Sequence, residues 1–243
     1  ACDALLSGDI EISSNVADGT TNVNVGGVCG KSGMLTAGCH AEWTESAHVK
    51  IASDRSNFGG VTGLTQAESN YAFLVGCYAL CKGRVEIEPK NGTDYTANAG
   101  GIAGTLANST IAGCTVKAKN IYGHNASSPS LIGVSGIAAY VVGVSSVSDC
   151  KAYATLIRNS TVLGTEDASV TPDNLFGMGM IVGIDAGTTT VTNCGVGGSF
   201  YLGASEKPQE LILTLDADSY AKGIIGSGKT ATVGGCYYWN GEK

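Results

Sequence analysis

Nine cysteines have the widest chemical range of any residues in this 243-residue chain. Cysteines form disulfides, hold metal ions, act as nucleophiles or fill a core. Their number is odd, no C-x-x-C pair occurs, and the three histidines, His40, His48 and His124, do not complete a ligand set. We therefore predict mainly reduced, packed thiols and no metal site. One or two disulfides between neighbouring repeats are the alternative.

Glu86 and Glu88 raise the question of catalysis, because pairs of carboxylates cleave glycosidic bonds. On an extended strand they share a face with Arg84 and lie roughly 6.6 Å apart, which an inverting glycosidase could use. Glu11 and Lys50 occupy the equivalent positions in the similar segments "IEI" and "VKI". Alternating charges on a solvated face are therefore the favoured interpretation.

Two further segments carry weaker signals. "GSGKT" (226–230) resembles part of a phosphate-binding loop, but it lacks the upstream glycine and the helix that such a loop needs, so a turn is favoured. "LDADSY" (215–220) offers Asp216 and Asp218 as calcium ligands, without a closing glutamate. The sequence thus predicts no catalytic residue, no cofactor and no enzyme activity.

Aromatic residues are the predicted binding residues. Four of them stand one or three residues after a cysteine. Because this number is odd, on a strand they face away from that cysteine. Exposed aromatic rings at stacked positions hold sugar rings or protein side chains. These candidates are Tyr78, Tyr153, Tyr237 and Trp239. The alternative is that loop segments cover them.

The composition excludes several classes of protein. A hydrophobic fraction of 43%, a charged fraction of 14% and 36 glycines argue against both a disordered chain and a helix bundle. The net charge of −7 argues against a nucleic acid partner. Residues 130–147 lie in the longest uncharged stretch, but glycines and serines interrupt them, so we predict part of a repeat rather than a membrane span.

Six cysteines recur at intervals of 38, 37, 36, 44 and 42 residues and mark a repeat: Cys39, Cys77, Cys114, Cys150, Cys194 and Cys236. A glycine motif precedes each of them, consisting of glycine, an aliphatic residue, a variable residue, and glycine or alanine. Its first glycine is Gly27, Gly60, Gly101, Gly136 or Gly223, and Met180 replaces it in the fifth copy. Repeats of this period indicate a solenoid or a propeller.

Cys2 lies 37 residues before Cys39, so we expect the chain to begin inside a repeat, as a fragment of a longer protein. The chain, 1–243, is predicted to form a single domain. Its approximate units are 1–25 (partial), 26–58, 59–99, 100–134, 135–177, 178–221 and 222–243.

Within each unit the hydrophobic period is two, which indicates half-buried strands. In "CYALC" (77–81), Cys77, Ala79 and Cys81 share one face. The residue before each repeated cysteine is Gly, Asp or Asn, and these types tolerate the left-handed conformation of a corner between strands. We therefore expect the cysteines to stack inside a solenoid, about 4.8 Å apart. The prolines lie in the variable linker part of the repeat period, in segments expected to form loops: Pro89, Pro129, Pro172 and Pro208.

The segment "GGIAGTLANSTIAGCTVKA" (100–118) resembles the GLUG repeat of bacterial surface proteins, which is named for Gly-Leu-any-Gly. "GCYALCKG" (76–83) and "GCYYWNG" (235–241) resemble the end of that repeat, and six or seven copies cover most of the chain. Ile, Val or Met stands in place of the leucine. The resemblance implies an adhesin-like β-helix at the bacterial cell surface or outside the cell, and no catalytic residues.

The predicted fold is therefore all-β, a right-handed parallel β-helix of about seven coils with long loops between them. The predicted function is non-enzymatic binding of a glycan or protein on a host or neighbouring cell, without a transmembrane segment. One alternative is a passive stalk or spacer of a larger surface protein. Another is a glycan-cleaving β-helix, which needs convergent acidic and basic side chains on one face.

Overall fold

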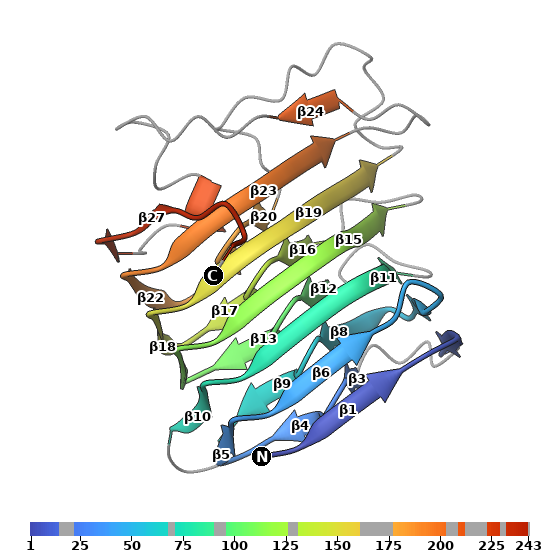
Figure 1. Ribbon diagram of the computed structural model, residues 1–243, viewed down its shortest axis with the longest axis horizontal. Helices are drawn as coiled ribbons and strands as arrows, with labels where there is room; N and C mark the ends of the chain where they lie inside the picture. The colour runs from blue at the N-terminus through green and yellow to red at the C-terminus, as the bar shows by residue number, and fades with distance from the viewer. Residues whose placement is uncertain are drawn as a thin grey trace.

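Parallel β-strands wind into a stack of coils (Figure 1). The computed structural model describes residues 1–14, 22–67, 71–89, 96–125, 131–160, 177–202, 209–211, 223–228 and 232–242. These residues are mainly strands in parallel sheets, so the predicted all-β parallel β-helix is confirmed.

Each complete coil passes through four sheets, which we call B, C, D and A in chain order. Sheet B contains β3 (Val23–Gly26), β8 (Arg55–Gly59), β12 (Thr96–Gly100), β16 (Leu131–Ser135) and β20 (Met178–Gly179). Sheet C contains β4 (Cys29–Ser32), β9 (Thr62–Gln66), β13 (Ala103–Ala107), β17 (Ala138–Val142), β21 (Val182–Asp185) and β25 (Ile225–Gly228). Sheet D contains β5 (Leu35–Ala37), β10 (Ala72–Val75), β14 (Ser109–Ala112), β18 (Val144–Ser148), β22 (Thr188–Thr192) and β26 (Thr232–Gly234).

Sheet A closes each coil and holds the longest strands, which lie side by side in Figure 1. It contains β1 (Asp3–Leu6), β2 (Asp9–Ser13), β6 (His40–Trp43), β7 (His48–Ala52), β11 (Tyr78–Glu88), β15 (Thr115–Asn125), β19 (Lys151–Ser160), β23 (Gly195–Leu202), β24 (Gln209–Leu211) and β27 (Tyr237–Tyr238). β11 is long enough to pair with both β6 and β7. Among the described strands, β24 is the one that pairs antiparallel, with β23.

The corner between sheets D and A explains the residue before each repeated cysteine. All six of these residues have positive φ values, between 54° and 65°: Gly38, Gly76, Gly113, Asp149, Asn193 and Gly235. Only glycine adopts this conformation without cost, and Asn and Asp tolerate it better than other residues. This conformation turns the chain, so the strand before it and the strand after it both direct apolar side chains into one core.

The glycine motif lies where sheet B turns into sheet C, against the inner face of sheet A. A Cβ atom on Gly60 would lie 2.8 Å from Cβ of Ala79, and one on Gly101 would lie 2.5 Å from Cγ2 of Val116. Each would also meet a backbone carbonyl of the next coil at less than 3.0 Å. The layers therefore touch at this edge without room for a side chain.

Three asparagines of sheet B form a ladder from coil to coil. The amide of Asn57 donates to Oδ1 of Asn24 at 2.8 Å, and the amide of Asn98 donates to Oδ1 of Asn57 at 3.0 Å. The hydroxyl of Thr105 also donates to Oδ1 of Asn57, at 2.6 Å. The next position in register is Gly133, so the ladder ends there. These bonds satisfy polar groups that are costly to bury unpaired.

Candidate functional site

The six repeated cysteines lie in one row at the corner between sheets D and A. All are buried, and a backbone hydrogen bond joins each corner to the next, such as that from the amide of Thr115 to the carbonyl of Cys77. Each thiol donates to the carbonyl two residues earlier, at 3.2 Å for Cys150 and 3.3 Å for Cys194. The cysteine thus closes the turn that the preceding residue begins.

The environment of these thiols does not favour reactivity. None of the nine cysteines, all of which lie among the described residues, forms a disulfide. Burial raises the pKa of Cys81 to about 12. Hydrogen bonds to Cys114 and Cys194, together with burial, raise the pKa of Cys150 well above its ordinary value. Hydrogen bonds with Cys150 and other neighbouring thiols lower the pKa of Cys114 and of Cys194, but both side chains are fully buried. A nucleophilic cysteine needs access to solvent as well as a lowered pKa, so we assign this row to packing and to closure of the corner.

A charged cluster surrounds Glu86 on the outer face of sheet A. Arg84 Nε forms an ion pair with one carboxylate oxygen of Glu86, and His48 Nε2 lies 3.6 Å from the same oxygen. His124 Nε2 lies 3.9 Å from the other oxygen. The Arg84 guanidinium lies over the ring of Tyr122, 4.2 Å from its centroid, and that ring stacks on His124 at an interplanar angle of 5°.

This arrangement encloses the Glu86 carboxylate, because the residue is only 8% exposed although it faces outward. Burial lowers the pKa of His124, and the nearby carboxylates of Glu86 and Glu88 oppose that shift. The cross-strand register places Lys50 beside Glu86 and Glu11 beside Lys50, as alternating charges require. Such a network stabilises neighbouring strands, and it leaves Glu86 poorly placed to meet a substrate.

Two of the four predicted aromatic residues, Tyr153 and Tyr237, are exposed, and the other two are packed against neighbours. Tyr78 begins β11 and packs on His40, with ring centroids 5.0 Å apart. Tyr153 and Tyr237 are exposed, and their rings lie on the outer face of sheet A. Trp239 is buried, at 8% exposure, although its position places it on the same outer face.

Trp239 lies over Gly197, where the absence of a side chain leaves room for the backbone of Trp239 and for the ring of Tyr153. Its ring meets Tyr153 edge to face, with centroids 6.4 Å apart. The ammonium groups of Lys117 and Lys151 lie 5.7 Å and 5.6 Å from the centroid of the indole. Aromatic and cationic groups from β15, β19 and the segment after β27 therefore meet at one place on sheet A.

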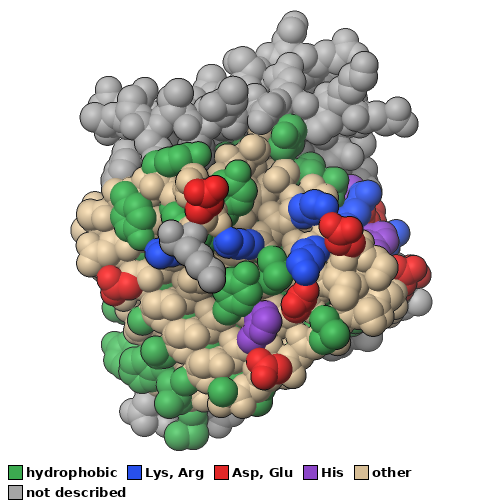
Figure 2. All heavy atoms as spheres, in the orientation of Figure 1, with side chains coloured by type: hydrophobic (Ala, Val, Ile, Leu, Met, Phe, Trp, Pro, Cys, Tyr) green, Lys and Arg blue, Asp and Glu red, His purple; other side chains and the backbone are tan. Residues whose placement is uncertain are grey.

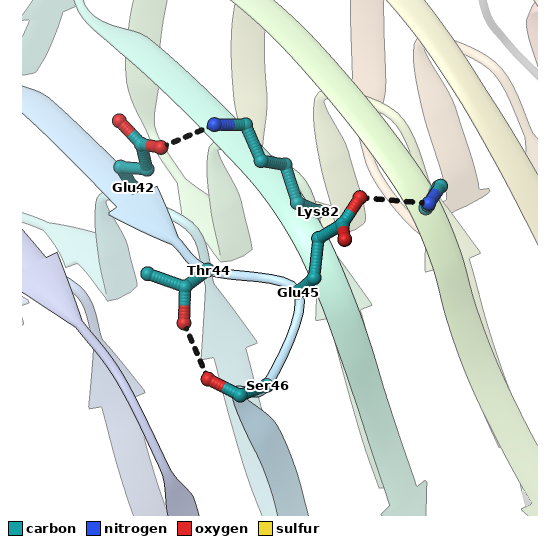
Figure 3. A network of polar contacts seen from close by, with 6 residues as sticks. Glu42, Thr44, Glu45, Ser46 and Lys82 are labelled. Atoms are coloured by element: carbon teal, nitrogen blue, oxygen red, sulfur yellow. Dashed lines mark hydrogen bonds and ion pairs between the residues drawn. The ribbon is translucent and has the colours of Figure 1, made fainter.

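Other lysines on this face are engaged in ion pairs. Lys82 on β11 contacts Glu42 on β6 at 2.6 Å, and Glu45, in the turn after β6, contacts Lys119 at 3.2 Å (Figure 3). Figure 2 shows these charged and imidazole groups gathered over sheet A. The outer face of sheet A is thus a surface of paired charges.

Some sequence candidates lie elsewhere or outside the described residues. Asp216 and Asp218 fall outside them, as do Lys229 and Thr230 of the "GSGKT" segment, whose first three residues end strand β25. In the described part of the chain, no group of three or more His, Cys, Asp or Glu residues could hold a metal ion. The same residues include no helix long and apolar enough to cross a membrane.

Sequence reasoning missed both the asparagine ladder and the pair of histidines around Glu86. The ladder has a signal, because Asn24, Asn57 and Asn98 each stand two residues before a Gly-Gly pair. The histidines have no such sequence signal, because His48 and His124 lie in different units and at different positions along their strands.

These features define a parallel β-helix protein with a charged and aromatic outer face. No protein-family model, curated protein or solved structure matches the chain.

Proposed function

We propose that this chain is a non-enzymatic, adhesin-like binding module of a bacterial surface or secreted protein, built from GLUG-like repeats. The supporting observation is the meeting of Tyr153 and Trp239 with Lys117 and Lys151 on the outer face of sheet A, where Tyr237 is also exposed. Aromatic faces stack on sugar rings or on protein side chains, and lysines pair with acidic groups. The ligand is therefore a glycan or protein of a host or neighbouring cell that presents a ring beside an acidic group.

The enclosed state of Glu86 supports a binding role over glycan cleavage. A glycosidase needs two carboxyl groups that reach the scissile bond, whereas Glu86 contacts Arg84 and two imidazoles. Incubation with acidic and neutral polysaccharides should release no new reducing ends. Turnover that Glu86→Gln abolishes would contradict this assignment.

Binding to glycan arrays and to extracellular-matrix proteins tests the proposal. We expect Tyr237→Ala and Lys151→Ala to weaken binding, because both side chains lie on the outer face of sheet A. Tyr238→Ala is the matched control, because Tyr238 is also exposed but pairs in register with buried Val196 and so lies on the other side of β27. Equal loss in all three variants would argue against a defined site.

The second candidate function is a passive spacer, which the parallel pairing of strands through successive coils favours. Absence of binding by this chain, together with binding by a longer protein that contains it, would support the spacer.

A further inference from the structure

The outer face of sheet D differs in chemistry from the rest of the solenoid. Its six described strands read LTA, AFLV, STIA, VSSVS, TTTVT and TVG, without one charged residue. Each of the other three sheets has at least one described strand with a charged residue, such as Arg55 in sheet B and Lys31 in sheet C. An uncharged face is notable in a protein with a net charge of −7.

Two rows of side chains run along this face, parallel to the solenoid axis. The parallel register aligns one residue from each coil in each row. The first row is Leu35, Phe73, Thr110, Ser146, Thr190 and Thr232, and the second is Ala37, Val75, Ala112, Ser148, Thr192 and Gly234. Neighbouring members of a row are about 4.8 Å apart.

The N-terminal half of this face is apolar and exposed. Leu35 is 64% exposed, Phe73 42% and Val75 39%, and Met34 and Tyr71 beside them are more than half exposed. Figure 2 shows hydrophobic side chains gathered over β5 and β10 at the lower left. Contiguous exposed apolar surface of this kind marks a binding surface.

The C-terminal half presents hydroxyl groups. Thr110 and Ser146 share a hydrogen bond of 2.9 Å between their hydroxyl oxygens. Thr188 and Thr190 are exposed on β22, and Thr232 is exposed on β26. Each hydroxyl both donates and accepts hydrogen bonds.

We propose that the outer face of sheet D binds a neutral, extended, β-linked polysaccharide whose chain lies along the solenoid axis. The spacing of the coils is close to the length of one sugar unit in such a chain, so that successive rings meet successive coils. Their C–H faces pack on Phe73 and its apolar neighbours, and their hydroxyls exchange hydrogen bonds with the Thr and Ser rows. A neutral chain also fits a face without charges, because an acidic ligand would find no counter-charge here and would be repelled by the net negative protein.

A second copy of the chain, packed antiparallel to the first, fits this face less well. A two-fold axis perpendicular to the solenoid axis would place the apolar half of one copy on the hydroxyl half of the other. Each copy also carries the same net negative charge. Self-association is therefore an outcome that the experiment has to detect.

The test measures affinity for soluble β-1,4-linked glucan hexasaccharide by calorimetry, and retention on insoluble β-1,4-glucan. Polygalacturonate is the charged control. Thr190→Lys introduces a charge in the middle of the first row, and Phe73→Ala removes its aromatic ring. Thr155→Lys places the same new charge on sheet A, where Thr155 faces outward beside Tyr153, and is the matched control. Circular dichroism should show that all variants remain folded, because the altered side chains lie outside the core.

We expect both sheet D variants to weaken glucan binding by roughly tenfold, with Thr155→Lys equal to the unaltered protein. The inference is overturned if the unaltered protein ignores neutral glucans or if Thr190→Lys binds them equally well. It is also overturned if Phe73→Ala instead abolishes a dimer seen by sedimentation, because a second copy would then be the occupant. Loss of binding in Tyr237→Ala alone would concern sheet A and the proposed function, so the two failures are distinguishable.

Discussion

Replacement of Gly101 by alanine tests the packing of the solenoid directly. The new Cβ would lie 2.5 Å from Cγ2 of Val116 and closer than 3.0 Å to the carbonyl oxygen of Gly136 in the next coil. The carbonyl belongs to a backbone that both neighbouring coils hold in register, so it cannot rotate away. Overpacking of this kind typically costs 1–3 kcal/mol, and we expect about 3 kcal/mol because the nearest contact is backbone.

Two control glycines separate this effect from others. At Gly234 no atom lies within 4 Å of an added Cβ and φ is not positive, so Gly234→Ala should change the free energy of unfolding by less than about 0.5 kcal/mol. At Gly76 there is also open space, but φ is +59°, so Gly76→Ala should cost about 1–2 kcal/mol from backbone strain alone.

Urea denaturation provides the measurement, followed by far-UV circular dichroism and by tryptophan fluorescence. Trp43 lies in β6, and Trp239 follows β27 near the opposite end, so fluorescence detects coils that unfold separately. We expect midpoints in the order Gly234→Ala, Gly76→Ala, Gly101→Ala, from highest to lowest. A Gly101→Ala protein with the midpoint and slope of Gly234→Ala would refute the close contact of layers described above.

Asn57→Ala should lower the free energy of unfolding by about 2–3 kcal/mol, because it leaves its ladder partners unpaired; an unchanged urea midpoint would argue against the ladder. Asn193→Gly should be neutral or stabilising and Asn193→Ala should cost about 1 kcal/mol, since φ there is 55°; thermal unfolding compares the two. Burial lowers the pKa of His124 below its ordinary 6.5, so the unfolded chain binds the proton more readily and stability should fall as the pH drops below about 6.5. His124→Gln should reduce that fall in stability. An unchanged dependence of stability on pH in this variant would contradict the assignment to His124. Mass spectrometry after brief alkylation should find Cys2 modified and Cys114 unmodified, because the first is exposed and the second buried; rapid native modification of Cys114 would contradict its placement in the core.

The sequence predicts the fold because two separate features of the repeat reflect it. The first feature is the spacing of the cysteines, which matches the strand register. The second is the residue type before each cysteine, which matches the positive φ values at those positions. Met180 departs from the glycine motif yet is fully buried, and its amide bonds to the carbonyl of Gly223. The backbone path therefore continues where the pattern fails, because hydrogen bonds to adjacent coils hold it.

The outer faces are harder to predict, because burial there depends on neighbours from other coils. The alternation of side chains along the strand predicts that Trp239 faces outward. Its burial follows from the missing side chain of Gly197 and from Lys117 and Lys151 in other repeats. Glu86 also faces outward as its position predicts, yet it is enclosed by histidines that follow no repeat pattern. Pairwise contacts between coils on the outside are not encoded in a single repeat.

The connections from sheet A to sheet B vary in length while the strands that they join remain in register. They include residues 53–54, 89–95, 126–130 and 161–177. Their starting points, at the ends of β7, β11, β15 and β19, lie next to one another on adjacent strands. Peptides inserted at these points would be presented several at a time, at a separation fixed by the strand spacing, which makes this edge suited to engineered multivalent display.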